Sequence, residues 1–421
     1  MSILIVAGTR PEAIKLAPVL WNLRREEYVF VWSGQHYDYE MSRIFFEQLG
    51  LPEPDVDLDV RSGTHAEQTA KIMMGLEKAI EKYKPAVVVA EGDTNTVVAA
   101  ALTAVKKFVP FAHVEAGLRS WDRTMPEEIN RIVADAVAEL HFAPTELAAI
   151  NLMHEGVPIR KIHITGNTVV DVVYRYLEEA KKWGRRLMDE LRLEPQTYIL
   201  VTIHRQENTD NAERLWNITK AIAELAKKYP VVFPIHPRTA NKMKEQGLLQ
   251  NLSAPNIHLL KPLGYFQFLG LLADALVVLT DSGGVQEEAC TLRIPTITLR
   301  YNTERPETVL VGINKVVGVE WQRVVEETLS AVEKRDELVK RASALSNPLG
   351  DGKAGERIAA ILKRAVEEGI KVPSSDTREK PAITYAVTEA PQPTDEVVAM
   401  YDERGLATVD KARARLYLVR R

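Results

Sequence analysis

Cysteine is almost absent from this chain, since Cys290 is the one cysteine among 421 residues. A single thiol excludes an intramolecular disulfide and a cysteine-based metal cluster, and it suits a reducing cytoplasm. Long apolar runs are absent as well, because none approaches the roughly 20 residues that cross a bilayer. The first apolar run, 3–7, follows no basic leader, so we expect a strand there and not a signal peptide. The expected protein is soluble and cytoplasmic, without a membrane partner.

The chain also lacks a strong excess of one charge. Its formal net charge is −4 and no basic stripe is present, so nucleic acid is not an expected partner. No Gly-x-Gly-x-x-Gly motif follows the first apolar run, which argues against a dinucleotide redox site. His-Glu-x-x-His is absent, and His141, His154 and His163 are scattered without metal-ligand spacing. We therefore predict no metal and no cofactor.

Apolar runs and amphipathic stretches alternate along the chain. Short runs typical of buried strands are separated by longer stretches with helical periodicity, such as 11–25 and 66–83. This alternation predicts an α/β protein with parallel sheets covered by helices on both faces. The predicted strands are 3–7, 29–33, 86–90 and 111–114, then, after a pause at 162–167, 198–202, 231–235, 257–260, 275–280 and 296–299.

The pause predicts two doubly wound, Rossmann-like domains, because 421 residues exceed one ordinary hydrophobic core. We place the first domain at residues 1–168 and the second at 169–366, with a last helix that can pack back on the first. The two sheets are expected to face a cleft, with ligands at the carboxyl ends of the strands. Residues 367–395 have a linker-like composition. For 396–421 we expect a short helix or strand, or a disordered tail.

A Ser-Gly-Gly turn separates an apolar run from a helical stretch in the second predicted domain. Gly283 and Gly284 lack the side chains that would keep backbone N–H groups from a phosphate, and the next helix directs its positive end there. Ser282 adds a hydroxyl donor, while Glu287 and Glu288 can accept hydrogen bonds from sugar hydroxyls. The turn therefore indicates a site for a nucleotide that carries a sugar. The simpler alternative is a tight turn capped by Ser282.

Charged side chains follow the predicted strands at several other points. Each stands where a strand ends or the next helix begins, which is the edge where doubly wound sheets bind ligands. These residues are Arg10, Lys15, Asp93, Glu115, Glu127, Glu128, His204 and His236.

Most of these residues also have a structural explanation when taken singly. Asp93 can cap a helix that starts at Thr94, and Glu127 and Glu128 lie in a first helical turn, where the helix dipole favours carboxylates. A histidine after an apolar strand, such as His204, is more often packed or hydrogen-bonded than catalytic. Acidic sites and histidines at several strand ends, facing an anion-binding turn, nevertheless favour an active site over coincidence.

Several segments form an ordered set of motifs. They are Gly8-Thr-Arg-Pro-Glu-Ala-Ile-Lys15, Gly92-Asp-Thr94, His113-Val-Glu-Ala-Gly-Leu-Arg119, Pro126-Glu-Glu128 with Asn130-Arg131, Gly166-Asn-Thr168, Thr280-Asp-Ser-Gly-Gly-Val-Gln-Glu-Glu-Ala289, Thr303-Glu-Arg-Pro-Glu307 and Asn347-Pro-Leu-Gly-Asp-Gly352. The set resembles that of the non-hydrolysing UDP-N-acetylglucosamine 2-epimerases, archaeal-like members in particular. The resemblance implies the two-domain glycosyltransferase-B fold, usually as a homodimer, and interconversion of UDP-N-acetylglucosamine and UDP-N-acetylmannosamine.

The resemblance also implies roles for single residues. Asp93, Glu115 and Glu127 match the family's catalytic carboxylates, and His204 matches its catalytic histidine. We expect Asp93 and Glu127 to form the proton-transfer pair, with Glu115 stabilising or relaying charge. For Phe268, which lies in an apolar run, core packing is the alternative to a role beside the uracil ring. The residues predicted to bind UDP or the sugar are Arg10, Lys15, His236, Phe268, Ser282, Gly283, Gly284, Glu288 and Arg305.

The implied reaction removes UDP before C2 is inverted. As the C1–O bond breaks, positive charge on the ring acidifies the C2 hydrogen, and elimination gives a 2-acetamidoglucal and UDP. Re-addition of UDP with a proton on the other face inverts C2. Such a route needs an anchored pyrophosphate, carboxylates near the ring and acid/base groups on both faces.

Departures from the commonest motifs leave the substrate open. The variant segment around Asn95 also occurs in relatives that epimerise UDP-2,3-diacetamido-glucuronic acid, which would need an extra cation. Candidates for that cation are Arg123, Arg205 and Arg238. The intact first motif and the Thr-Glu-Arg-Pro-Glu motif favour UDP-N-acetylglucosamine instead.

The class of activity and its regulation are open as well. A metal-independent glycosyltransferase and a non-catalytic nucleotide-sugar sensor both fit an anion-binding turn in a two-domain fold. Gln35 and His36 match part of a second, activating substrate site found in bacterial members, although the changed segment at His236 argues against such regulation.

Overall fold

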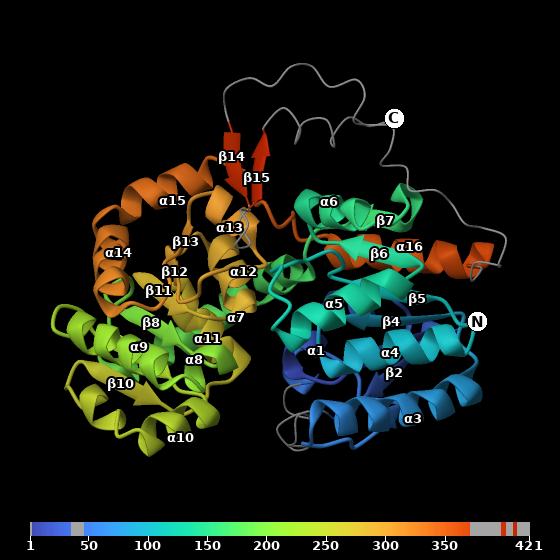
Figure 1. Cartoon of the computed structure of the whole chain (residues 1–421), viewed down its shortest axis with the longest axis horizontal. Helices are drawn as coiled ribbons and strands as arrows, with labels where there is room; N and C mark the ends of the chain where they lie inside the picture. Colours follow the sequence, from blue (N-terminus) through green and yellow to red (C-terminus); the bar gives the residue numbers. More distant parts are fainter. Residues whose placement is uncertain (1, 35–45, 371–396, 401–406, 411–421) are drawn as a thin grey trace. The chain divides into compact units, whose positions relative to one another are not determined.

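The computed structural model describes residues 2–34, 46–370, 397–400 and 407–410 (Figure 1). They belong to two compact units, one made of Met1–Val172 with Gly350–Arg421 and the other of Val173–Leu349. The chain passes from the first unit to the second inside one long helix, α7 (Thr168–Leu191), which starts where the predicted boundary stands. Gln35 and His36, and with them the match to an activating site, lie outside the described residues.

The first unit holds a seven-stranded sheet in the order β3-β2-β1-β4-β5-β6-β7, with every neighbouring pair parallel. The strands are β1 (Ile3–Ala7), β2 (Tyr28–Trp32), β3 (Val56–Asp57), β4 (Val87–Glu91), β5 (Phe111–Val114), β6 (Leu140–Ala143) and β7 (Ile162–Ile164). After β1 the chain builds one side of the sheet, and at β4 it crosses to the other side. This reversal between β1 and β4 is a topological switch point, where open α/β sheets bind ligands.

Helices of the first unit begin at polar caps. Thr9 and Thr64 each accept a hydrogen bond from the glutamate N–H three residues on, and that glutamate side chain bonds back to the cap, which stabilises both helix starts. The helical segments are α1 (Arg10–Trp21), η1 (Arg25–Glu27), α3 (His65–Tyr83), α4 (Asn95–Lys106), α5 (Pro126–Val137), α6 (Glu146–His154), η2 (Ile159–Lys161) and α16 (Ala354–Glu368).

The last of these helices, α16, returns to the first unit from far along the chain. It packs against α1, and a Cβ on Gly355 would lie 2.4 Å from the Pro18 backbone, so only glycine permits this approach. The Asp171 carboxylate accepts the backbone N–H groups of Ala354 and Gly355, which satisfies the start of the helix.

The second unit repeats the architecture with a six-stranded parallel sheet in the order β10-β9-β8-β11-β12-β13. Its strands are β8 (Ile199–Thr202), β9 (Val231–Pro234), β10 (Ile257–Leu260), β11 (Val277–Thr280), β12 (Thr296–Thr298) and β13 (Asn314–Val316). Its helical segments after α7 are α8 (Gln206–Thr209), α9 (Ala212–Leu225), α10 (Pro237–Glu245), η3 (Leu249–Leu252), α11 (Tyr265–Ala273), α12 (Gly283–Leu292), α13 (Pro306–Leu310), α14 (Trp321–Glu333) and α15 (Arg335–Ser343). The switch point lies between β8 and β11.

Packing in the second unit is close. Buried side chains of α9 and α14 form one core cluster with strands β8, β9 and β11, while α11 approaches α7 through Gly184 and Gly270. A Cβ on Gly270 would lie 2.0 Å from the Ala180 carbonyl oxygen, so neither backbone could approach the other with a larger residue there.

The predicted strands agree with observed strands to within one or two residues at each end. The structure adds four short strands that the hydrophobic pattern did not identify, namely β3, β6, β7 and β13. β3, β7 and β13 are only partly buried, so they lack the continuous apolar run on which the prediction depended.

Beyond residue 370 the structure describes one antiparallel strand pair, β14 (Val397–Met400) with β15 (Ala407–Asp410), coloured red in Figure 1. The sequence allowed a strand in this extension. The linker-like segment lies outside the described residues, apart from 367–370.

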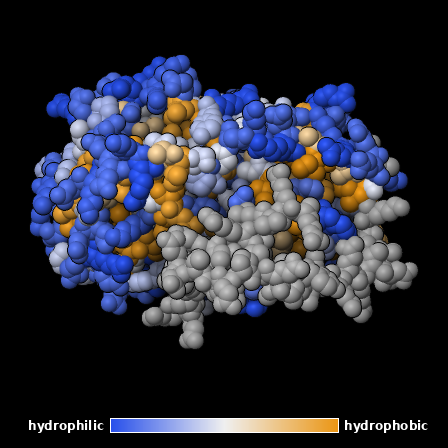
Figure 2. Space-filling view, turned by 90° about the horizontal axis from the view of Figure 1, so that it is seen from above, coloured by the Kyte–Doolittle hydropathy of each residue, from blue (hydrophilic) through white to orange (hydrophobic). Residues whose placement is uncertain are grey.

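On the face seen in Figure 2, the residues that are not grey are mostly hydrophilic (blue), with apolar residues (orange) between them. Large apolar side chains that are exposed include Met74, Phe108 and Trp216. Within the described part of the chain, no helix combines the length and apolar character needed to cross a membrane.

Candidate active site

Lys15 is the centre of a buried charged cluster at the switch point of the first sheet. Its Nζ lies 2.5 Å from Oε2 of Glu115 and 3.4 Å from Oε1 of Glu91, at the ends of β5 and β4. All three side chains are almost inaccessible to solvent. Glu115 has φ +69°, a left-handed conformation that costs on the order of 1–3 kcal/mol in a residue with a side chain. The fold holds this carboxylate in place despite that cost, as expected of a functional group.

Glu12 connects the first loop of the sheet to the turn after β4. Its carboxylate accepts the backbone N–H groups of Gly8 at 2.7 Å and Thr9 at 2.6 Å, and the hydroxyl of Thr94 at 2.5 Å. Thr94 in turn caps α4. Burial raises the pKa of Glu12 to about 7, although these hydrogen bonds oppose the shift.

Asp93 lies in that same turn and is held at both its side chain and its backbone. Its carboxylate lies 2.5 Å from the Arg131 guanidinium, and the Asn130 side chain donates to its carbonyl oxygen at 2.9 Å. Arg131 also pairs with Glu128 at 2.6 Å. Thr94, and not Asp93, supplies the helix cap, so the capping explanation for Asp93 is wrong.

Glu127 and Glu128 differ in role although they are adjacent. Glu128 is fully buried and accepts the backbone N–H groups of Ser120 and Trp121, so it fixes the loop before α5. Glu127 is half-buried at the start of α5 and makes no hydrogen bond or ion pair with another described residue. Its carboxylate is therefore available to a ligand, as far as the described residues go.

A second buried network, of hydrogen bonds and ion pairs, contacts the turn that contains Asp93. His113 lies 2.6 Å from Asp135 through Nδ1 and 2.8 Å from the Gly92 carbonyl oxygen through Nε2. Both partners are acceptors, so both ring nitrogens donate. Burial lowers the pKa of His113, but Asp135 and the Gly92 carbonyl outweigh burial and raise that pKa overall. Arg119 pairs with Asp135 at 2.7 Å and completes the network.

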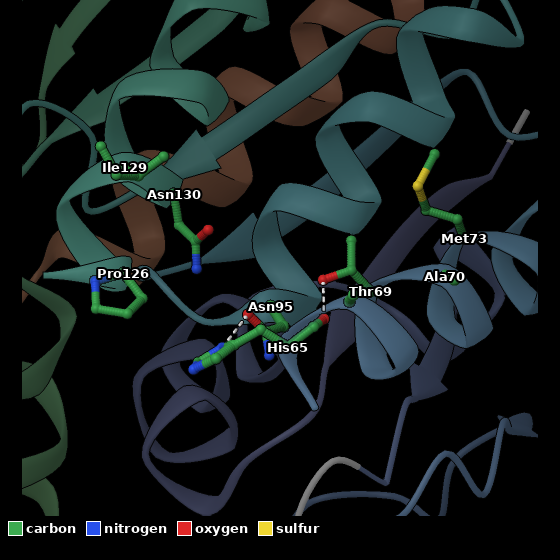
Figure 3. A pocket seen from close by; sticks show the side chains of 9 residues that line it. His65, Thr69, Ala70, Met73, Asn95, Pro126, Ile129 and Asn130 are labelled. Carbon is green, nitrogen blue, oxygen red and sulfur yellow. Dashed lines mark hydrogen bonds between the residues drawn. The ribbon is translucent and has the colours of Figure 1, made fainter. Parts of the chain in front are cut away.

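A cavity of about 490 Å³ lies beside this turn, between α3, α4 and α5 (Figure 3). The Nδ1 atom of His65 is 3.1 Å from the Asn95 side-chain oxygen, and Asn130 links the cavity to the carbonyl of Asp93. Most of the remaining lining is apolar: Ala66, Thr69, Ala70, Met73, Pro126 and Ile129.

In the second unit, Asp281 organises the loop that carries His204. Its fully buried carboxylate accepts the backbone N–H groups of His204 and Arg205, each at 3.0 Å, and the side chain of Asn208 at 3.1 Å. The His204 ring is 42% exposed, with Nε2 at 3.9 Å from Asp281. Asp281 thus fixes the backbone conformation of the loop, while the histidine ring is accessible.

The Ser-Gly-Gly turn has the geometry of an anion site. α12 begins at Gly283, and Ser282 stands at its cap position without a side-chain capping hydrogen bond, so capping does not explain the serine. A Cβ on Gly284 would meet nothing within 4 Å, whereas one on Gly283 would lie 2.7 Å from Glu304. A side chain would thus fit at Gly284, whereas one at Gly283 would require the Glu304 carboxylate to move.

The two glutamates after this turn diverge. Glu287 is fully buried and pairs with Arg305, which is itself buried. Glu288 lies beside the Tyr265 hydroxyl, and burial together with this carboxylate raises the pKa of Tyr265. Both glutamates are buried, and they differ in partner: Glu287 pairs with an arginine and Glu288 lies against a tyrosine.

The other predicted ligand contacts occupy helix starts and α11. Arg10 is the first residue of α1, and His236 is the exposed cap of α10, where its Nδ1 accepts from the Arg238 N–H at 3.2 Å. Phe268 is half-buried in α11 and so belongs to neither the core nor the open surface.

Sequence reasoning did not select Glu12, Glu91, Arg131 and Asp281 as site residues. A signal for Glu12 was present, since Thr9-x-x-Glu12 has capping-box spacing. A signal for Glu91 was also present, since it comes at the end of an apolar strand, as Glu115 does. For Arg131 and Asp281, only membership of a motif pointed to a role.

No group of three or more His, Cys, Asp or Glu side chains in the described ranges is arranged to hold a metal ion. The acidic residues of the run 55–59 have other partners: Asp55 pairs with Arg25, and Asp59 with Arg61 at 2.7 Å.

Two doubly wound parallel-sheet domains define the class of the protein, the glycosyltransferase-B type of α/β fold, as predicted from the sequence. A family model described as UDP-N-acetylglucosamine 2-epimerase matches residues 22–363. The chain therefore belongs to the UDP-N-acetylglucosamine 2-epimerase family, and the predicted enzyme class is confirmed.

Three relatives illustrate this membership. The chain is 47% identical over 369 residues to a UDP-N-acetylglucosamine 2-epimerase of Methanocaldococcus jannaschii, covering 86% of this chain and 99% of that protein. It is 40% identical to a UDP-2,3-diacetamido-2,3-dideoxy-D-glucuronate 2-epimerase of Pseudomonas aeruginosa, covering 86% and 100%. A crystal structure of the M. jannaschii UDP-GlcNAc 2-epimerase in complex with UDP-GlcNAc and UDP superposes with a TM-score of 0.81 at 46% identity, covering 86% and 100%.

Proposed function

We propose that the protein catalyses reversible epimerisation at C2 of UDP-N-acetylglucosamine to UDP-N-acetylmannosamine. The observation that carries the proposal is the buried ion pair of Lys15 and Glu115 at the switch point, with Asp93 in the turn after β4. A sugar that is losing UDP becomes cationic, and carboxylates fixed beside it stabilise that charge. Family membership and the ligands bound to solved relatives support this substrate.

The proposed reaction divides between the two units, with chemistry in the first and UDP binding in the second. UDP departs from C1 with the electron pair of the C1–O bond. A carboxylate removes the C2 proton, which leaves a 2-acetamidoglucal. A second acid delivers a proton to the other face of C2 as UDP adds back to C1. We assign the proton transfers to Asp93 and Glu127, and charge stabilisation to Glu115.

Several residues contribute because one acid or base supplies only about 10²–10⁴-fold in rate. Lys15 and His204 are assigned to the departing phosphate. Lys15 is oriented by the carboxylates of Glu91 and Glu115. The accessible ring of His204 belongs to a loop whose backbone is hydrogen-bonded to Asp281. Arg10 offers a further cation at the start of α1.

We assign UDP to the open end of α12. Backbone N–H groups at Gly283 and Gly284 and the Ser282 hydroxyl bind phosphate, and Glu288 binds the ribose hydroxyls. Phe268 lies against the uracil ring. Arg305 and His236 complete the ligand contacts, with Arg305 oriented by its ion pair with Glu287.

The alternative substrate, a diacetamido-glucuronate, needs a cation for its acid group. Arg205 already pairs with Glu304 at 2.9 Å, and Arg238 with Asp210 at 2.5 Å, while Arg123 is exposed. Two of the three candidate guanidinium groups are thus neutralised by partners, which favours UDP-N-acetylglucosamine. The P. aeruginosa relative keeps the alternative worth testing.

One experiment tests the proposal. Incubation of UDP-N-acetylglucosamine with the protein in deuterated water should yield the manno epimer with deuterium at C2. An epimer unlabelled at C2 would contradict the proton-transfer route. Product analysis also separates the rivals: a transferase consumes donor only with an acceptor, a sensor turns nothing over, and a hydrolysing relative releases free N-acetylmannosamine. Turnover of the diacetamido-glucuronate alone would shift the substrate assignment.

We propose further that the protein is a cytoplasmic homodimer. The cavity between α3, α4 and α5 offers an open, largely apolar surface, and Ile129 beside it is 37% exposed. The single buried thiol suits a reducing compartment. Light scattering after size exclusion should give twice the chain mass, and Ile129→Glu should lower it. A wild-type monomer would contradict the dimer.

A further inference from the structure

Glu91 is a buried carboxyl group to which the reaction above assigns no task. It ends β4 and is 2% exposed. Its Oε1 has no hydrogen-bond partner among the described residues and lies 3.4 Å from Lys15 Nζ, beyond good hydrogen-bond distance. Glu91 and Glu115 share one cation, since the Lys15 Nζ contacts a carboxylate oxygen of each. Buried polar atoms are rarely left in this way without a reason.

The local charges do not balance if every carboxyl group is ionised. Lys15 is one cation and contacts both Glu91 and Glu115, while Glu12 adds a further carboxyl group whose charge acts on Glu91. Lys15 is closest to Glu115, at 2.5 Å, so Glu115 is the carboxylate that Lys15 neutralises. Two carboxyl groups that share one buried site do not both ionise, and the one farther from the cation holds a proton.

We propose that Glu91 is protonated and donates a hydrogen bond to ionised Glu115, so that Glu91 is a positioning residue for the catalytic cluster. The inference deepens the proposed epimerisation and rests on it. The Glu91 proton and the Lys15 ammonium bind Glu115 together and fix the direction of its carboxylate toward the substrate side. Atoms balance without a further reactant, since the proton stays on Glu91 during turnover and exchanges only with water.

The groups around Glu91 set its response to pH. Burial, Glu115 and Glu12 raise the pKa of Glu91 well above its ordinary range, and Lys15 opposes them. On the packed elements, β1 has no titratable residue and α4 only Lys106 in its last turn, while His113 of β5 bonds the carbonyl of Gly92. As pH rises through the raised pKa, Glu91 ionises and competes with Glu115 for Lys15. Epimerisation by the wild type should therefore fall on the alkaline side.

Two substitutions separate this role from a merely structural one. Glu91→Gln keeps the shape and an N–H donor but cannot ionise, so kcat near neutral pH should stay within about threefold and the alkaline fall should disappear. Glu91→Leu removes the donor, so kcat should drop by about 10²-fold while KM changes little, because a misplaced group costs that much. Glu139→Gln, whose carboxylate pairs with Lys161 at 2.8 Å away from the switch point, should keep the wild-type pH profile.

A spectroscopic measurement makes the test independent of turnover. Because the pKa of Glu12 is also raised, to about 7, Glu12 contributes to the infrared band of protonated carboxyl groups near neutral pH. The band should therefore be present in both proteins and weaker in Glu91→Gln than in the wild type. An unchanged alkaline limb in Glu91→Gln, or no difference between the two spectra in this band, would overturn the inference even when the wild type forms labelled epimer. A wild type that shows the band but no epimerisation would instead refute the proposed function. If Glu91→Leu fails to fold, the pH profile and the infrared spectrum of Glu91→Gln still test the inference.

Discussion

The two switch points of this protein differ in the chemical groups found at them. In the first unit, Lys15 and several carboxylates pack side by side, and their charges depend on one another. In the second, α12 begins with Gly283 and Gly284, and the buried ions beside it are paired. The same fold thus has interacting charged side chains in one unit and a glycine-lined helix start in the other, which suits the proposed reaction, in which UDP leaves and adds back.

The largest effect is expected at Asp93. Asp93→Asn keeps the shape of the side chain but removes the charge paired with Arg131, so kcat should fall about 10²–10⁴-fold. The fall in kcat is measured from steady-state rates of epimer formation. Asp189→Asn, an exposed carboxylate on α7, is the matched control and should leave kcat unchanged. If Asp93→Asn turns over normally, chemistry does not depend on the first switch point.

A stability test concerns His113, which supports the Asp93 turn. Because its pKa is raised in the folded state, its contribution is present in full below the ordinary histidine value and is lost as pH rises through the raised pKa. His113→Gln should lower the free energy of unfolding by about 1.5–3 kcal/mol at pH 6 and flatten its decline toward higher pH. Denaturant titrations at several pH values measure both. Exposed His154→Gln serves as control, and a variant with the wild-type slope would exclude His113 as its source.

The two glycines of the anion site should respond in opposite ways. Gly284→Ala places a methyl group in open space within a helix, so stability should rise by about 0.5–1 kcal/mol while UDP binds roughly tenfold more weakly. Gly283→Ala meets Glu304 and should destabilise the fold. Calorimetric UDP titration and thermal unfolding give both quantities. Unchanged UDP affinity in Gly284→Ala would argue against phosphate at this helix.

The smallest effect on stability is expected for Ser282→Ala. The Ser282 hydroxyl makes no capping bond, so the free energy of unfolding should change by less than about 0.5 kcal/mol, whereas loss of a true cap costs about 1 kcal/mol. UDP affinity should fall severalfold. If Ser282→Ala instead lost as much stability as the loss of a helix cap costs, and bound UDP normally, capping would explain Ser282 after all.

Much of this architecture follows from the sequence because buried parallel strands require continuous apolar runs, as at Phe111–Val114. β3, with one half-buried and one exposed residue, carries no such signal. Candidate site residues could be chosen from the sequence where motifs were specific, as at Lys15 and Gly284. Glu91 was not, because its role depends on which side chains meet at the strand ends, and residues far apart in sequence determine that.

The return of α16 to the first unit also affects the order in which the chain can fold. On a ribosome, the second unit is complete before residues 354–368 have been made, while the surface of α1 that Gly355 will cover is still bare. The second unit can thus fold while the first is still incomplete. The first unit, by contrast, must close a loop that contains the whole second unit. Termination of synthesis just before α16 would therefore expose the first unit, and not the second, to misfolding.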